Sequence, residues 1–289
     1  MADVVQVEQR PDRVTTGPVV PDLVRPAGRR KVRQRSRPLS LALRALVPLA
    51  LLGLWWLATD AGWVRKQVLV SPWRVAETFD SMFRTDDLAH HLGVSLTRSG
   101  IGLLIGAAAG LVLGAVAGLS RLGEELLDSS LQMLRTVPFL AVVPLFIIWL
   151  GIGETPKIVL IALATVFPVY LNTSSGVRNV DRRVVEAAQS YGLSRLRVTR
   201  EVVLPLALPQ IFTGLRYSMG VSVLALIAAE QINANAGIGY LLNQAESYGQ
   251  INILLACVII YCVLGLLGDV VVRFLEHVAM PWRGGVAAR

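Results

Sequence analysis

Long apolar runs alternate with short polar segments along most of this chain. Six such runs occur, at roughly 41–59, 92–119, 134–150, 157–176, 211–229 and 251–275. A stretch of about 17 to 25 mostly apolar residues is long enough for a helix to cross the hydrocarbon core of a bilayer. The pattern therefore predicts an all-α membrane protein with six transmembrane helices, contained in one domain at 41–283.

Shorter elements are expected between these runs. Residues 75–83 place apolar side chains at helical spacing after Ser71 and Pro72, which predicts a short helix on the outer surface. Residues 121–135 are expected to form a short inner loop and the start of the third run. The segment from Gly151 to Pro156 predicts a tight outer turn, because proline suits the first turn of the helix that follows.

Composition agrees with a membrane protein, since 54% of the residues are apolar and only 17% are charged. Soluble domains carry about 25% charged residues. The net charge of +8 would also suit a nucleic-acid-binding protein, but ten of the 28 Lys and Arg residues lie in the first 44 positions and seven more between Arg178 and Arg216. Positive clusters beside apolar runs are typical of membrane orientation, so no nucleic-acid partner is expected.

The same charges predict which segments face the cytoplasm. Segments 1–44 and 178–216 are rich in Lys and Arg, whereas 230–250 contains neither. Because cytoplasmic loops retain positive charge, both termini and the segment 177–210 are predicted to lie on the cytoplasmic side of a bacterial plasma membrane. Residues 1–40 are predicted to form a disordered basic tail near anionic lipid, and 284–289 a second tail.

Glycines recur at every fourth position of the second run. They are Gly102, Gly106, Gly110, Gly114 and Gly118. This period places all five on one stripe of a helix, where a second helix can approach to backbone contact, so we expect close helix packing. Arg98 lies near the outer end of the same run and allows two interpretations. Its side chain can extend to the membrane interface, which we favour, or it can offer a positive charge to an entering anion.

The polar segment 177–210 has small residues at particular positions. Ala187 and Ala188 allow another body to approach a helix closely, and Gly192 suits the left-handed residue that ends it. Ser194 can cap a second helix, which Pro205 and Pro209 are expected to end or kink. An ordinary solvated loop needs none of these features, so a docking element is predicted.

At this segment the chain resembles the signature loop of binding-protein-dependent ABC importer permeases. The matching pattern is Glu186-Ala187-Ala188, three residues, Gly192, nine residues, Val202-x-Leu204-Pro205, where the family has isoleucine in place of Val202. The resemblance extends over roughly 70–283 and is similar to the sulfonate, taurine and nitrate branch, with aliphatic sulfonate permeases nearest. Further runs that fit this branch are Met133–Pro138, Trp149–Glu154, Arg178–Asp181, Ser190–Leu193 and Asn233–Leu241.

The resemblance implies a type I ABC importer permease fold. Two copies of the chain would form the pore, two ABC ATPase subunits would dock on the inner loops, and an extracytoplasmic substrate-binding protein would deliver a small organic anion. The ATPase contact would then be made by the residues of the signature loop and its arginine flanks: Glu186, Ala187, Ala188, Gly192, Arg182, Arg183, Arg195, Leu204 and Pro205. The chain has no phosphate-binding loop, so ATP and Mg are expected on the partner ATPase and no enzyme activity here.

Other assignments rest on weaker patterns. A short helix at Gly239–Glu246 is expected near the outer mouth, as part of a gate formed by Asn233, Asn235, Gly237, Gly239 and Tyr240. Polar residues that either line the translocation path or bond between helices are Asn172, Thr173, Ser174, Ser175 and Ser222.

A self-contained secondary transporter is the alternative from another class. It requires ionisable groups inside the membrane, and Glu230 and Asp269, both near the ends of apolar runs, are the candidates. The three histidines, and Cys257 and Cys262 five residues apart, do not form a ligand set, so no metal site is expected.

Overall fold

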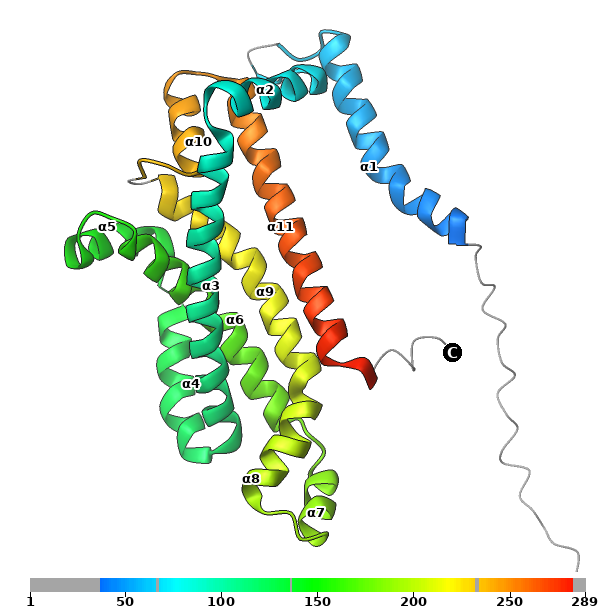
Figure 1. Cartoon of the computed structure of the whole chain (residues 1–289), viewed down its shortest axis with the longest axis vertical. Helices are drawn as coiled ribbons and strands as arrows, with labels where there is room; N and C mark the ends of the chain where they lie inside the picture. The colour runs from blue at the N-terminus through cyan, green and yellow to red at the C-terminus, as the bar shows by residue number, and fades with distance from the viewer. Residues whose placement is uncertain (1–36, 66–67, 136, 232–233, 283–289) are drawn as a thin grey trace, which may run out of the picture. The chain divides into compact units, whose positions relative to one another are not determined.

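The computed structural model describes residues 37–65, 68–135, 137–231 and 234–282, and within these ranges all regular secondary structure is helical. The chain divides into two units, 1–51 and 52–289, and the second contains everything discussed below. The helices, labelled in Figure 1, are α1 (Arg37–Asp60), α2 (Pro72–Thr85), α3 (Leu88–Leu119), α4 (Arg121–Arg135), α5 (Phe139–Leu150), α6 (Thr155–Arg178), α7 (Arg182–Ser190), α8 (Arg195–Val198), the π-helical turn η1 (Thr199–Val203), α9 (Leu204–Gln231), α10 (Ile238–Ser247) and α11 (Ile251–Ala279).

Among the described residues, four helical stretches are long and apolar enough to cross a membrane. They are α3, α6, the continuous run Arg195–Gln231, and α11. Two shorter apolar helices occur at Leu46–Asp60 and Ala141–Leu150. Helices thus cover five of the six predicted runs throughout and most of the third. The first of them, α1, begins at Arg37, so the last four residues of the expected 1–40 tail are helical. Residues 1–36 and 284–289 lie outside the described residues.

The third run differs from the expectation. Residues 121–135 form a helix, α4, and not a loop, and the run 134–150 is divided because α4 ends at Arg135 and α5 begins after Pro138. The charged residues that indicated a loop are in fact on one side of α4. Arg178 of α6 pairs with Glu124 at 2.7 Å and with Asp128 at 3.2 Å. These ion pairs attach α4 to the C-terminal end of α6.

The helix pair α3 and α6 is packed along the glycine stripe. A Cβ atom at Gly102, Gly114 or Gly118 would lie 2.7 Å from the Cβ of Ile161, Thr173 or Val177, and one at Gly110 would lie 2.7 Å from the carbonyl oxygen of Val166. At Gly106 the space is narrower still, against Thr165 and the backbone of Ala162. Since real Cβ atoms do not approach so closely, larger side chains on this stripe would force the two helices apart.

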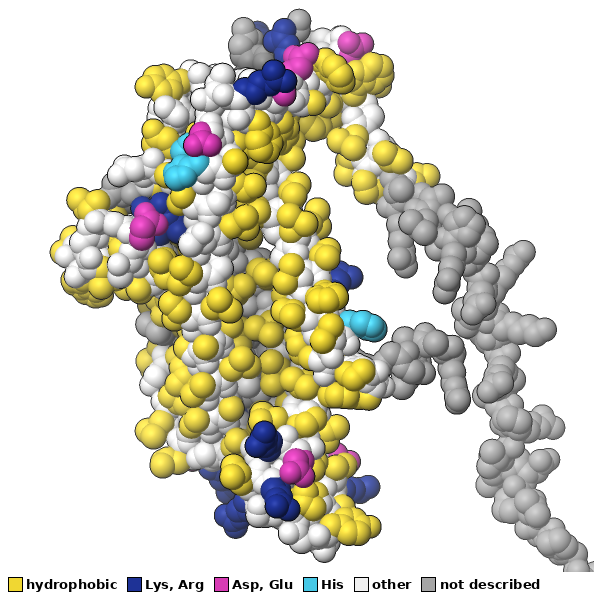
Figure 2. Space-filling view, in the orientation of Figure 1, with side chains coloured by type: hydrophobic (Ala, Val, Ile, Leu, Met, Phe, Trp, Pro, Cys, Tyr) yellow, Lys and Arg dark blue, Asp and Glu magenta, His cyan; other side chains and the backbone are white. Residues whose placement is uncertain are grey.

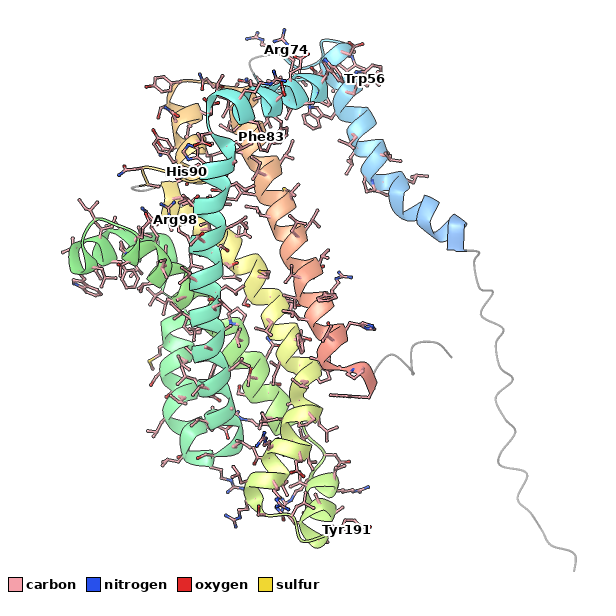
Figure 3. The ribbon with its side chains drawn as sticks, viewed as in Figure 1. Trp56, Arg74, Phe83, His90, Arg98 and Tyr191 are labelled. Atoms are coloured by element: carbon pink, nitrogen blue, oxygen red, sulfur yellow. The ribbon has the colours of Figure 1, made fainter. Side chains whose placement is uncertain are left out.

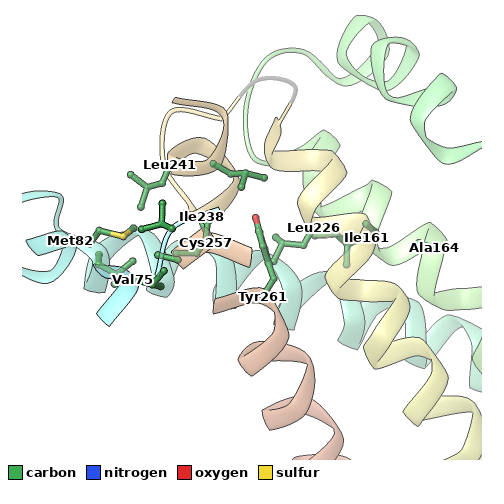
Figure 4. Close-up of a cluster of buried hydrophobic side chains, with 14 residues drawn as sticks. Val75, Met82, Ile161, Ala164, Leu226, Ile238, Leu241, Cys257 and Tyr261 are labelled. Carbon is green, nitrogen blue, oxygen red and sulfur yellow. The ribbon is translucent and has the colours of Figure 1, made fainter. Parts of the chain in front are cut away.

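One end of the second unit is held together by an apolar cluster. Side chains from α2, α9, α10 and α11 meet there, among them Val75, Leu226, Ile238, Cys257 and Tyr261 (Figure 4). The predicted amphipathic helix at 75–83 is present as α2, whose buried residues include Val75 and Met82. In Figure 1, α2 and α10 lie at this end, and α7 and α8 lie at the opposite end of the long helices.

Pro205 and Pro209 do not end a helix, which was one of the two alternatives expected for them. Helical structure runs without a break from Arg195 to Gln231, with Pro209 inside α9. A π-helical turn at Thr199–Val203, closed by the Leu204 N–H donating to the Thr199 carbonyl, directly precedes Pro205. A proline ring clashes with the carbonyl four residues before it in a regular α-helix, and a widened turn relieves that clash.

Candidate functional site

The short helix α7 has defined signals at both ends. At its start, the side chain of Asp181 accepts a hydrogen bond of 2.9 Å from the Arg183 backbone N–H. At its end, Gly192 adopts φ +84°, its N–H donates to the Gln189 carbonyl at 2.9 Å, and the Leu193 N–H donates to the Ala188 carbonyl at 3.3 Å. These two bonds and the left-handed glycine form a Schellman motif, which is the ending predicted from Gly192.

One side of α7 is attached to the membrane helices. Val185, Ala188 and Leu193 pack against a buried cluster that contains Val198 and Ala207 from the helical run leading into the membrane. Ser194 occupies the cap position of α8, with its side chain making no cap bond, and Leu204 and Pro205 are half-buried in the continuing helix. A push on α7 therefore acts directly on α9.

The other side of α7 is open. No residue of α7 is buried, and Ala187 and Glu186 are exposed. Tyr191 and Leu196, 87% and 78% exposed, extend this surface (Figure 3). Arg182, Arg183 and Arg195 are also exposed, and Arg182 donates to Glu186 at 2.9 Å. Figure 2 shows basic and acidic side chains beside hydrophobic ones at this end of the molecule. Exposed apolar groups rimmed by charge are typical of a surface that binds another protein.

At the opposite end of the long helices from α7, Arg98 is the centre of a buried ionic network. Its Nη1 donates to Glu230 at 2.7 Å and to the Ala236 carbonyl at 2.6 Å. Its other edge, Nε and Nη2, donates to both carboxylate oxygens of Glu154, with 2.7 Å for the Nη2 bond. The Arg98 side chain is only 4% exposed. Extension of Arg98 to the interface, which the sequence favoured, is therefore wrong.

Glu230 connects this arginine to the loop after α9. Its carboxylate accepts bonds of 2.8 and 2.9 Å from Ser95 and one of 2.9 Å from the Gly239 N–H. Ser95 in turn accepts from the Ile238 N–H at 2.9 Å. Gly237 adopts φ +119°, and a Cβ there would lie 2.7 Å from Arg98 Nη1. The segment 236–239 is thus wrapped around a buried carboxylate.

The remaining residues of the expected outer gate lie close to this network. The Gly237 N–H donates to His91 at 2.9 Å, and the rings of His91 and Tyr240 stack with centroids 5.7 Å apart. Asn235 is exposed, and Asn233 lies outside the described residues. The expected short helix is present as α10, Ile238–Ser247.

Glu154 is the solvent-exposed member of this ionic network. It precedes α6 in the outer turn, its side chain is 55% exposed, and Lys157 also donates to it, at 3.1 Å. Chiefly through its hydrogen bonds, Arg98 lowers the pKa of Glu154 from 4.5 to about 2, against an opposing effect of burial. The carboxylate is therefore charged at any physiological pH.

The polar residues proposed for the translocation path have different surroundings. Thr173, Ser174 and Ser222 are buried, and the hydroxyls of Ser174 and Ser222 donate to carbonyls three residues earlier in their own helices. Asn172 is half-buried and accepts from Gln210 at 3.0 Å, and Ser175 accepts from Asn179 at 3.1 Å. Of the bonds named here, the one between Asn172 and Gln210 joins two helices, α6 and α9, and the Thr173 hydroxyl has no hydrogen-bond partner among the described residues.

Comparison with known proteins places this geometry in context. A family model described as the binding-protein-dependent transport system inner membrane component matches residues 106–278. A relative from Escherichia coli (strain K12), named as an aliphatic sulfonates transport permease, SsuC, is 48% identical over 236 residues, 82% of this chain and 90% of its own length. The Bacillus subtilis (strain 168) protein of the same name is 42% identical, over 82% of this chain and 86% of its own length.

One further relative and one solved structure are more distantly similar to this chain. The taurine transport system permease TauC of Escherichia coli (strain K12) is 36% identical over 87% of this chain and 92% of its own length. Among solved structures, an amino acid ABC transporter with histidines matches with a TM-score of 0.55 at 20% identity, covering 69% of this chain and 97% of that chain. The last similarity concerns the fold alone.

Proposed function

Because the chain belongs to the family of inner membrane components of binding-protein-dependent transport systems, we propose that it is the permease subunit through which an aliphatic sulfonate enters the cell. The family makes it the permease component of an ABC importer, working with a separate ATPase. The sulfonate rests on the two relatives named for aliphatic sulfonates, at 48% and 42% identity over most of both chains.

The observation that carries the coupling role is the geometry of α7. The helix is firmly capped, packed on one side against the run that becomes α9, and exposed on the other. We assign the ATPase contact to the signature-loop residues around Ala187 and Gly192, with Arg182, Arg183 and Arg195 at the rim. Movement of the docked ATPase would then be transmitted to the membrane helices through α8 and η1.

The same family assignment supports the assembly that we propose. Two copies of this permease pair with two ATPase subunits, and an extracytoplasmic binding protein delivers the substrate at the α2 and α10 end. Six crossings, with α4 and α5 together making the third, leave both termini and α7 in the cytoplasm. The absence of Lys and Arg from 230–250 and their abundance in 178–216 support this orientation.

Taurine, nitrate or another small oxyanion carried by this family is the second candidate, and the relative named for taurine favours it at 36% identity. The secondary transporter has less support. Its candidate Asp269 is paired with Arg216 at 3.3 Å and Arg273 at 2.7 Å, and Glu230 is enclosed by the Arg98 network.

Uptake by reconstituted transporter tests the proposal. Proteoliposomes with this permease, its ATPase and its binding protein should take up radiolabelled ethanesulfonate only when ATP is hydrolysed, and excess unlabelled ethanesulfonate should compete better than taurine or nitrate. Stronger competition by taurine or nitrate would reassign the substrate. Uptake by the permease without any ATPase would overturn the importer mechanism.

A further inference from the structure

A cavity of about 620 Å³ opens where Arg98 lies next to Glu154, the partner of its Nε/Nη2 edge, near the start of α6. It is lined by Arg98 and Glu154 and by apolar side chains that include Val94, Ile101 and Ile158. Ligand sites commonly have this size and combine apolar walls with a few placed polar groups. In Figure 3, Arg98 and His90, another lining residue, lie on this part of α3.

Two sides of the Arg98 guanidinium differ in how firmly they are held. Nη1 is bound to Glu230, whose side chain is fully buried, and to the Ala236 carbonyl. The Nε/Nη2 edge is occupied by Glu154, whose side chain is 55% exposed. Glu154 lies in the turn between α5 and α6, next to Gly153. A Cβ atom added to Gly153 would have no atom within 4 Å, so the space beside this turn is open. The arginine is therefore fixed in place, while the carboxylate on its outer edge has room to leave.

Charge balance defines what can replace this carboxylate. Arg98 and Lys157 supply two positive charges, and Glu154 and Glu230 supply two negative charges, so the network is neutral as observed. Displacement of Glu154 leaves one net positive charge beside the cavity. An arginine edge binds a planar pair of oxygens through two parallel hydrogen bonds, and a sulfonate offers such a pair with a single negative charge.

We propose that the Nε/Nη2 edge of Arg98 is a binding site for an alkyl-bearing oxyanion, which displaces Glu154 and places its alkyl chain against Val94, Ile101 and Ile158. The inference rests on the proposed function and adds to it a substrate contact on the permease itself. Glu154 and the anion therefore compete for the same edge of Arg98. Glu154 pairs with Arg98 when no anion is bound, and the anion displaces Glu154 when it binds.

The test measures binding to the permease–ATPase complex in lipid nanodiscs, without the binding protein, so that any bound anion sits on the membrane complex. Ethanesulfonate is titrated at constant ionic strength, with ethyl methyl sulfone as the uncharged analogue. Glu154→Gln removes the negative charge that competes for Arg98. The dissociation constant for ethanesulfonate should fall about tenfold, because the anion no longer has to replace a charge-assisted hydrogen bond between Arg98 and Glu154. The sulfone should respond weakly and equally in both proteins.

Glu124→Gln is the matched control. Glu124 is also a half-exposed partner of an arginine, Arg178, but lies at the inner end, so the same change of charge should leave ethanesulfonate binding unchanged. Equal ethanesulfonate binding by wild type and Glu154→Gln would overturn the proposal. So would a Glu154-dependent response to short-chain phosphatidylglycerol in place of ethanesulfonate, because the cavity would then be a lipid site.

The two proposals fail in different ways. If wild-type proteoliposomes show no ATP-driven ethanesulfonate uptake, the assigned function is wrong. If uptake occurs but Glu154→Gln alters neither binding nor the concentration dependence of uptake, only the Arg98 site is wrong.

Discussion

Arg98 Nη1 lies 2.7 Å from a carboxylate oxygen of Glu230, and the two side chains are 4% and 0% exposed. They are 132 positions apart in the chain and join the outer end of α3 to the last turn of α9. An ion pair in such surroundings contributes less to stability than its geometry suggests, because both charges lose their hydration. Removal of one partner alone is costly, since the other is left charged and buried.

Arg98→Met should therefore destabilise the purified permease by roughly 3–5 kcal/mol, the usual cost of breaking a buried pair, because it leaves the buried Glu230 carboxylate without its arginine. Replacing both residues, as in Arg98→Met with Glu230→Gln, should recover part of this loss because no buried charge remains unpaired. Thermal unfolding in detergent measures both variants. A double variant that is less stable than either single variant would show that the charge pair is not the stabilising contact.

Gly106→Ala should lower the melting temperature, because the added methyl group meets Thr165 and the Ala162 backbone. Overpacking of this kind typically costs about 1–3 kcal/mol. Gly100→Ala is the matched control on the same helix, where an added Cβ meets nothing within 4 Å, so it should be neutral or slightly stabilising. Equal melting temperatures for the two variants would contradict close packing of α3 on α6 along the glycine stripe.

Gly192→Asp should leave the permease inserted and folded but unable to bind the ATPase. The site is open, and aspartate tolerates positive φ better than most residues, so the fold survives. A carboxylate on the docking face must lose its hydration when the ATPase covers it, which should weaken the complex at least about tenfold.

Gly192→Asn has nearly the same shape without the charge and should retain much more binding. Co-purification of the ATPase with each variant gives the comparison. Normal ATPase association and normal uptake in Gly192→Asp would remove the docking assignment from this loop.

The contribution of Glu154 to stability should depend on pH in a defined window. Its pKa in the folded protein is about 2, below the reference value of 4.5, so the charged form is the one that the fold stabilises. The contribution is complete above about pH 4.5 and disappears as the pH falls towards 2. The difference in melting temperature between wild type and Glu154→Gln should shrink over that interval. A difference that stays constant there would show that Glu154 is not held by Arg98.

Local features of the site were predictable, whereas long-range pairing was not. Gly192 is in the predicted left-handed conformation because a helix ending needs only neighbouring residues to define it. Arg98 was misplaced because its partners, Glu154 and Glu230, lie 56 and 132 positions away, and a single arginine near the end of an apolar run equally suits the interface. The only available signal was Glu230, an acidic residue at the end of an apolar run.

Charged residues also concealed the nature of α4. Glu124 and Asp128 lower the apolar content of 121–135 to that of a loop, but Arg178 pairs with both. Proline was misleading for a different reason. Pro205 would end a regular helix, yet a π-helical turn precedes it, and nothing in the sequence rules for caps and breakers indicates such a turn.

The unbroken helical run from Arg195 to Gln231 has a mechanical consequence. At about 1.5 Å per residue its 37 residues form a rod on the order of 55 Å long. One end starts three residues after Gly192, and the other carries Glu230 in its last turn. We therefore expect that a tilt applied at the α7 end, where we propose that the ATPase docks, moves the buried Glu230 carboxylate at the far end of the rod.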